Sequence, residues 1–237
     1  MDLMPTTDTA PTAERPARIP ADAGRVGLPP WVAAAVPVVG LLAVVAAALV
    51  TGIAAPDQLS DPGALTRWGV PVSEFLASLS MTVTIAAVIF AAGVLPPEVG
   101  RRRRRRAGAR AAQERHERDE HPAFTLTMTI AAAGAAVWTL SSLAVAVLSY
   151  SDLAGVPVSA GEQFTAGLMV YAQQISVGRA WFATAAIAAV VTSLAVAVRG
   201  HAGLFWTGIV AMLGIVPQAL IGHAAGGDDH YGAVNSI

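Results

Sequence analysis

Five stretches of this chain are long, apolar and almost free of charge, and shorter polar segments separate them. A core helix of a soluble protein rarely runs 18 or more residues without a charge, whereas a helix that crosses hydrocarbon must do so. The pattern therefore predicts an all-α, polytopic integral membrane helix bundle. The predicted spans are residues 31–53, 74–95, 124–150, 179–198 and 204–221.

The polar segments define the rest of the predicted organisation. Residues 1–28 are rich in Pro, Thr, Ala and Asp, which is typical of a disordered tail, and residues 29–237 form the transmembrane domain. Residues 54–73 and 151–177 are predicted as loops on the outer face. The last five residues turn apolar again, so we expect the chain to be the N-terminal portion of a longer membrane protein.

Arginine is concentrated in one loop, residues 98–122, which holds nine arginines including six in a row from Arg101 to Arg106. Basic residues are retained on the cytoplasmic side of a membrane. This loop and the N-terminus are therefore predicted to be cytoplasmic, and the C-terminal segment extracytoplasmic, in the cell membrane. We expect the arginine run to contact anionic lipid rather than nucleic acid, because the loop has no aromatic residue to stack on bases.

Composition supports the membrane interpretation and excludes some chemistry. Apolar residues make up 54% of the chain and charged residues 13%, against about 25% charged in an ordinary soluble domain. The absence of cysteine excludes disulfides, thiolate metal sites and cysteine nucleophiles. The spans show no nucleophile–base arrangement and carry ionisable residues only at their ends, which disfavours an enzyme and a proton-coupled pump.

One short segment has the composition of a metal site. His223, Asp228, Asp229 and His230 lie within eight residues, just after the last span. Imidazole suits copper, zinc and nickel, and a carboxylate adds a hard oxygen donor. The alternative is that these are ordinary solvated loop residues. His116, His121 and His201 are interpreted as solvated or headgroup-facing residues on the cytoplasmic side.

Methionines in the apolar segments are weaker candidates. A thioether is a soft ligand for Cu(I), but a lone Met in an apolar helix usually fills space. The methionines concerned are Met81, Met128, Met169 and Met212.

Two arginines lie on the outer side, against the general trend. Arg67 is placed to pair with Asp61 or Glu74, and Arg179 with Glu162. Structural ion pairing that fastens the outer loops is favoured over binding of an anionic partner.

Several stretches together resemble a known family. They read DPGALTRWGVPVSEFLASLSMTVTIAAVIFAAGVLPP, LSYSDLAGVPVSA, QISVGRAWFATAAIAAVVT and IGHAAGGDDHYGAVNSI. These resemble the N-terminal half of actinobacterial copper resistance D (CopD) membrane proteins, which are often fused to a CtaG-type cytochrome c oxidase assembly domain. The resemblance covers residues 56–237, and its GHAA…H motif falls on His223 and His230.

That resemblance implies copper transport, copper resistance or copper delivery toward oxidase assembly, with copper as the bound metal and assembly factors or a C-terminal continuation as partners. A different hypothesis stays open. Small residues such as Gly40, Gly93, Gly134 and Gly214 suit close helix packing, as in an accessory membrane subunit without metal.

Overall fold

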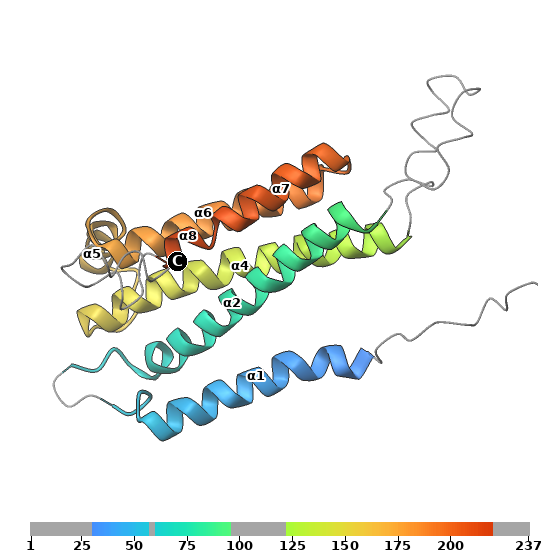
Figure 1. The fold of residues 1–237 in the computed structure, drawn as a ribbon. Coiled ribbons are helices and arrows are strands. Elements are labelled where there is room, and N and C mark those ends of the chain that lie inside the picture. The colour runs from blue at the N-terminus through green and yellow to red at the C-terminus, as the bar shows by residue number, and fades with distance from the viewer. Residues whose placement is uncertain (1–29, 57–59, 96–121, 220–237) are drawn as a thin grey trace, which may run out of the picture.

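A computed structural model describes residues 30–56, 60–95 and 122–219 of the chain. Within these residues every regular element is a helix. The long helices are α1 (Pro30–Thr51), α2 (Ala64–Gly93), α4 (Pro122–Ala154) and α6 (Ser176–Ala197). The shorter ones are α5 (Glu162–Gln174), α7 (His201–Leu213) and α8 (Val216–Ala219), and Figure 1 shows their arrangement.

The predicted helix class and the number of spans are confirmed. Helices α1, α2, α4 and α6 are each long and apolar enough to cross a membrane, and so is the stretch Ala202–Ala219 that contains α7 and α8. Many large apolar side chains are exposed, for example Val50 at 88% and Leu140 at 68%. Such exposure is expected where hydrocarbon rather than water surrounds a helix bundle.

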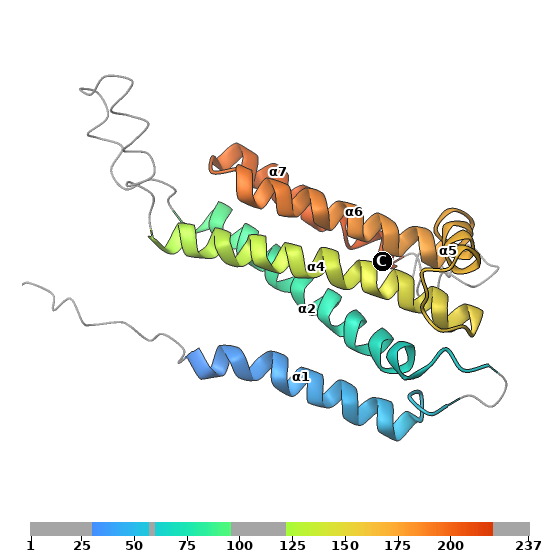
Figure 2. The same ribbon diagram turned by 180° about the vertical axis from the view of Figure 1, so that it is seen from behind.

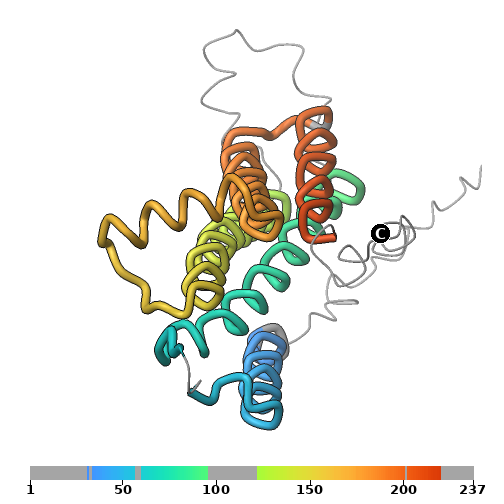
Figure 3. Tube along the Cα trace, turned by 90° about the vertical axis from the view of Figure 1, so that its left-hand side faces the viewer, coloured from blue at the N-terminus to red at the C-terminus, as the bar shows by residue number. Residues whose placement is uncertain are grey.

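Helices α2, α4, α6 and α7 pack together, whereas α1 lies to one side and packs on α2 (Figures 1 and 2). Viewed along the bundle, α5 runs across one end of α4 and α6 (Figure 3). We call this the α5 end. The turn from α6 into α7 lies at the opposite end, which we call the Arg199 end.

A regular spacing of small residues explains why α2 packs so closely on α4. The buried positions of α2 alternate steps of four and three residues, and those of α4 do the same. A 3.5-residue period keeps one seam facing its neighbour through several turns, as in a coiled coil. The α2 seam is Ser73, Ala77, Ser80, Thr84, Ala87 and Ala91; the α4 seam is Phe124, Met128, Ala131, Ala135, Trp138, Ser142 and Val145.

Two contacts fix the register of this antiparallel pair. Near the α5 end the buried hydroxyls of Thr66 and Ser151 are 2.8 Å apart. Near the middle a Cβ at Gly134 would lie 2.7 Å from Thr84 Oγ1, so glycine is needed for the close approach. At the closest point between the two helices, Thr84 of α2 therefore lies opposite Gly134 of α4.

The predicted loop over residues 151–177 is largely helical, which corrects the sequence interpretation. Helix α5 lies within it and is held by an aromatic cluster. The ring of Tyr150 is 5.0 Å from that of Phe164 and 5.7 Å from that of Tyr171. Aromatic side chains with a polar tip are favoured at membrane surfaces. The α5 end therefore has the features of a membrane–water interface.

Helix α2 begins ten residues before the predicted span, so it contains both Arg67 and Glu74. Of the two pairings considered for Arg67, the structure has the one with Asp61, and Arg67 Nε also donates to the carbonyl of Ala54 at 3.0 Å. The Arg67 hydrogen bond and the Gly63 N–H hold the pKa of the Asp61 carboxyl below its usual value. Glu74, predicted as the first residue of the second span, instead lies ten residues inside α2.

Candidate functional site

The four predicted copper ligands, His223, Asp228, Asp229 and His230, lie outside the described residues, and so does the arginine run. Helix α8 is the last described element before them, and it packs against α6. Within the part of the chain that the structure describes, no three His, Asp or Glu side chains gather as a metal group.

The fifth predicted span, residues 204–221, consists of two helices over its described residues. Helix α7 ends at Leu213, and α8 begins at Val216. The 13 residues of α7 extend about 20 Å, less than the roughly 30 Å of a bilayer core. The break therefore lies at membrane depth, where irregular backbone is tolerated only if protein or a polar cavity surrounds it.

Local sequence explains the break. Pro217 has no N–H to donate to the carbonyl of Leu213, so α7 cannot continue unchanged through this turn. Gly214 lies directly against the six-membered ring of Trp138, and a Cβ there would overlap the ring. Trp138 is fully buried in the middle of α4. The break is thus fitted to one large side chain.

Four polar atoms in this part of the bundle are buried and have no hydrogen-bond partner. They are Trp138 Nε1, Ser142 Oγ, Thr184 Oγ1 and Gln218 Nε2. A buried donor or acceptor left unpaired costs about 1–3 kcal/mol. Each such group in a native structure needs a physical explanation, such as a bound water or ion.

These atoms come from three helices that meet around the break. Trp138 and Ser142 are one turn apart on α4, and Gln218 lies on α8 just beyond Gly214. The hydroxyls of Thr139 and Thr192 are 3.4 Å apart and fix the antiparallel register of α4 and α6. Thr184 is eight residues from Thr192 toward the α5 end, so it lies about 8 Å beyond the depth of Ser142. The unpaired atoms thus occupy the α5 half of the bundle.

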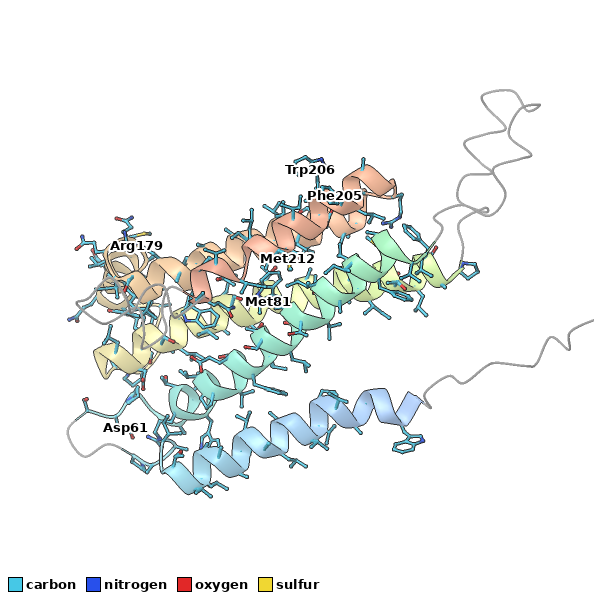
Figure 4. The ribbon with its side chains drawn as sticks, viewed as in Figure 1. Asp61, Met81, Arg179, Phe205, Trp206 and Met212 are labelled. Carbon is cyan, nitrogen blue, oxygen red and sulfur yellow. The ribbon has the colours of Figure 1, made fainter. Side chains whose placement is uncertain are left out.

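Two of the four candidate methionines lie in the bundle interface next to this layer. A Cβ at Gly208 of α7 would lie 3.7 Å from Val88 of α2, which sets the register of these helices. Met212 is one turn past Gly208 and Met81 two turns before Val88, so their depths differ by about one turn. Figure 4 shows them at neighbouring levels between α2 and α7.

The remaining described candidates do not join this group. Met128 is 1% exposed and packs in a separate apolar cluster that includes Phe124 and Leu204. Met169 is exposed on α5. Arg179 and Glu162 are both described, and they do not form the predicted ion pair. Figure 4 shows Arg179 at the α5 end of the bundle.

Comparison with known proteins places this architecture in a family. A family profile for the copper resistance protein D-like, N-terminal domain matches residues 65–233. The match spans nearly all of α2, every later helix and the candidate ligands from His223 to His230. No curated protein matches the chain significantly, and no solved structure does so either.

Proposed function

The chain belongs to the copper resistance protein D-like family of multi-pass membrane proteins, and we propose that it binds copper at the outer membrane face and passes it into or across the bundle. The observation that carries this proposal is the family match, because it covers both the bundle and the His/Asp segment. Copper is the substrate of this process rather than a resident cofactor. Ligand exchange alone is enough for copper that enters as Cu(I). Cu(II) bound by the imidazoles has to accept one electron from an external reductant before thioether ligands take it.

The first binding step is assigned to His223 and His230, with Asp228 or Asp229 assisting. Neutral imidazole is a good ligand for copper, and a neighbouring carboxylate supplies an oxygen donor. His223 follows Ala219, the last residue of α8, by four positions. Metal bound there would be close in sequence to the broken span.

A second binding step is assigned to Met81 and Met212. Thioether sulfur is a soft, neutral ligand that favours Cu(I) and does not have to lose a proton first. Met81 is partly buried against the core, and 49% of the Met212 side chain is exposed. The pair could therefore receive a monovalent cation from a less buried position.

The test is a metal titration of the purified protein in lipid nanodiscs. The double variant His223→Ala, His230→Ala should lower Cu(II) affinity at least tenfold. Binding to the wild type should fade between about pH 7 and pH 6, because a protonated imidazole cannot ligate. Equal stoichiometry and affinity in the two proteins would refute this ligand assignment.

The methionine step is tested separately with Cu(I) held under reducing conditions. Met81→Leu, Met212→Leu should reduce Cu(I) binding and copper uptake by cells, while leaving Cu(II) affinity unchanged. Met169→Leu is the matched control, because this methionine is exposed on α5. If the control reduces Cu(I) binding as much as the double variant, the paired site is not the one responsible.

Delivery toward cytochrome c oxidase assembly is a further part of this proposal. It is supported by the resemblance to actinobacterial CopD proteins that are fused to CtaG-type domains. A strain lacking this protein should have less active oxidase at low copper, and added copper should restore the activity. Normal oxidase activity at low copper would separate copper handling from oxidase assembly.

A metal-free accessory subunit is the competing function. Its support was a set of small residues suited to packing against another protein. Three of these glycines are used inside the chain: Gly40 lies against Phe75, Gly134 against Thr84 and Gly214 against Trp138. A Cβ at Gly93 would meet nothing within 4 Å, so only this one faces open space. The internal contacts therefore remove most of the support for this alternative.

A further inference from the structure

We propose that the α7–α8 break forms an internal polar site that binds a small hydrogen-bond acceptor, either water or a halide ion. Trp138 Nε1 and Gln218 Nε2 donate to it, and the hydroxyl of Ser142 completes its lining. The unpaired hydroxyl of Thr184 lies about 8 Å deeper and is outside this site. This site is distinct from the copper ligands proposed above and does not depend on them.

The first argument is a contrast among the buried hydroxyls. Nine serine and threonine residues are buried in the described part of the chain. Seven of them have a backbone carbonyl within hydrogen-bond distance, as Thr84 has that of Ser80 at 2.7 Å and Ser141 that of Val137 at 2.7 Å. Ser142 and Thr184 do not. A helical hydroxyl normally has this local option, so these two side chains are oriented toward something else.

The second argument is the chemistry of the unpaired atoms. An indole nitrogen can only donate, and an amide nitrogen also donates. Trp138, Ser142 and Thr184 are each fully buried, so neither bulk water nor lipid can satisfy them. A set that contains two obligate donors favours an electron-rich acceptor rather than a bare cation.

The third argument is the position of the set beside a discontinuous helix. Irregular backbone at membrane depth is stable where it lines a polar or water-filled space. Internal waters typically bond to about three otherwise unsatisfied polar groups. The break and the unpaired atoms of Trp138, Ser142 and Gln218 thus point independently to the same kind of ligand.

The first experiment is radiolytic hydroxyl-radical labelling of the wild-type protein in nanodiscs. Radicals generated from internal water oxidise adjacent side chains, and tryptophan and methionine are both highly reactive. Trp138 should be oxidised at least tenfold faster than Met128, which is equally inaccessible but packed among apolar residues. If Trp138 is as protected as Met128, internal water is refuted, and the site then stands only if the chloride replacement below reveals a halide.

Single cysteines then test the lining, since the natural chain contains none. Ser142→Cys should react with a small methanethiosulfonate at least tenfold faster than Ser141→Cys and Thr207→Cys. Both control positions are buried and bonded to backbone. Equal rates in the three variants would refute the assigned lining.

A final arm distinguishes the two ligands. Replacing chloride with gluconate should leave the Ser142→Cys rate unchanged if water occupies the site. A severalfold change in that rate would assign a halide ion. An unchanged Ser142→Cys rate together with a protected Trp138 would refute the internal site altogether.

Discussion

At the scale of single residues, a buried hydroxyl in this bundle stabilises the fold when it joins two helices rather than one. Most buried Ser and Thr side chains bond to their own helix. Ser151 differs, because its Oγ donates to the carbonyl of Val156 at 2.6 Å and lies 2.8 Å from Thr66 Oγ1. Since Ser151 has one hydrogen, Thr66 supplies the hydrogen for the bond between helices. The two residues thus connect α2, α4 and the start of the next loop.

Ser151→Ala should therefore destabilise the protein by about 1–2 kcal/mol, because it leaves a buried hydroxyl and a carbonyl without this partner. Denaturant titration in mixed micelles measures the change. Ser193→Ala is the control, since Ser193 is exposed and bonds only to Ala189 of its own helix. Equal losses in the two variants would contradict the role assigned to Ser151.

Tyr171 carries a pH dependence that can be assigned to one group. Burial raises the pKa of its phenol, and a hydrogen bond with Ser149 partly opposes the shift. The folded protein then holds this proton more tightly than the unfolded chain does. The contribution to stability is complete below about pH 10, the usual phenol pKa, and is lost as pH rises through the higher folded value.

The measurement is the tyrosinate absorbance of wild type minus that of Tyr171→Phe. We expect the difference titration to have its midpoint above about pH 10. In Tyr171→Phe, raising the pH above about 10 should no longer weaken the packing of α5 against α4 and α6. A midpoint at or below pH 10 would show that the ring is not buried as the structure has it.

Residue-scale sequence reasoning succeeded where partners are close in sequence. Arg67 and Asp61 are six residues apart, and their ion pair is present. Arg179 and Glu162 are separated by a helix that was not predicted, and they do not pair. The unpaired set around Trp138 comes from three helices. Whether these polar atoms find partners depends on side-chain rotamers and on the register between helices, which a single sequence does not reveal.

At the scale of elements, hydropathy identified the long helices because each holds an apolar window of about the required length. It missed α5, whose 13 residues include Glu162, Gln163, Gln173 and Gln174. The signal that could have found it is the spacing of Phe164, Leu168 and Tyr171, one face of a short helix. The break in the fifth span had a signal too, in Pro217 three residues after Gly214.

The turn between α5 and α6 supplies an element-scale prediction. A Cβ at Gly178 would overlap the backbone carbonyl of Tyr171, and backbone cannot move aside as a flexible side chain can. Gly178→Ala should cost about 1–3 kcal/mol and release α5. Hydrogen exchange of the α5 amides and the thermal midpoint measure the two effects.

Gly208→Ala is the matched control for that variant. Gly208 also lies within a helix, and its added Cβ would meet Val88 at an ordinary 3.7 Å. Alanine has the higher helix propensity, so this variant should be neutral or slightly stabilised. Faster exchange in α5 of the control would show that the effect is not specific to the α5–α6 turn.

At the scale of the whole molecule, exposed aromatic side chains define the second membrane surface. Phe205 and Trp206 are 61% and 63% exposed near the start of α7, at the Arg199 end (Figure 4). Trp31, at the start of α1, is 70% exposed. Together with the tyrosines at the α5 end, they form the two aromatic belts expected of a membrane protein.

Orientation follows from charge, and we propose that the Arg199 end is cytoplasmic. The loop with Arg101 to Arg106 joins α2 to α4, and both of those helix termini lie at this end (Figure 1). Basic loops are retained on the cytoplasmic side, and each arginine near an anionic surface contributes about 1 kcal/mol. The His223 segment then lies on the outer face if the broken fifth span crosses the bilayer.

Reporter fusions after residues 110, 200 and 227 test this topology. Two spans, α4 and α6, separate the first pair of positions, so both should report the cytoplasm. The α7–α8 stretch separates residue 200 from residue 227, so the last fusion should report the outside. If it reports the cytoplasm instead, the broken span re-enters rather than crosses. The copper ligands His223 and His230 would then lie on the inner face, which would reverse the proposed direction of copper entry.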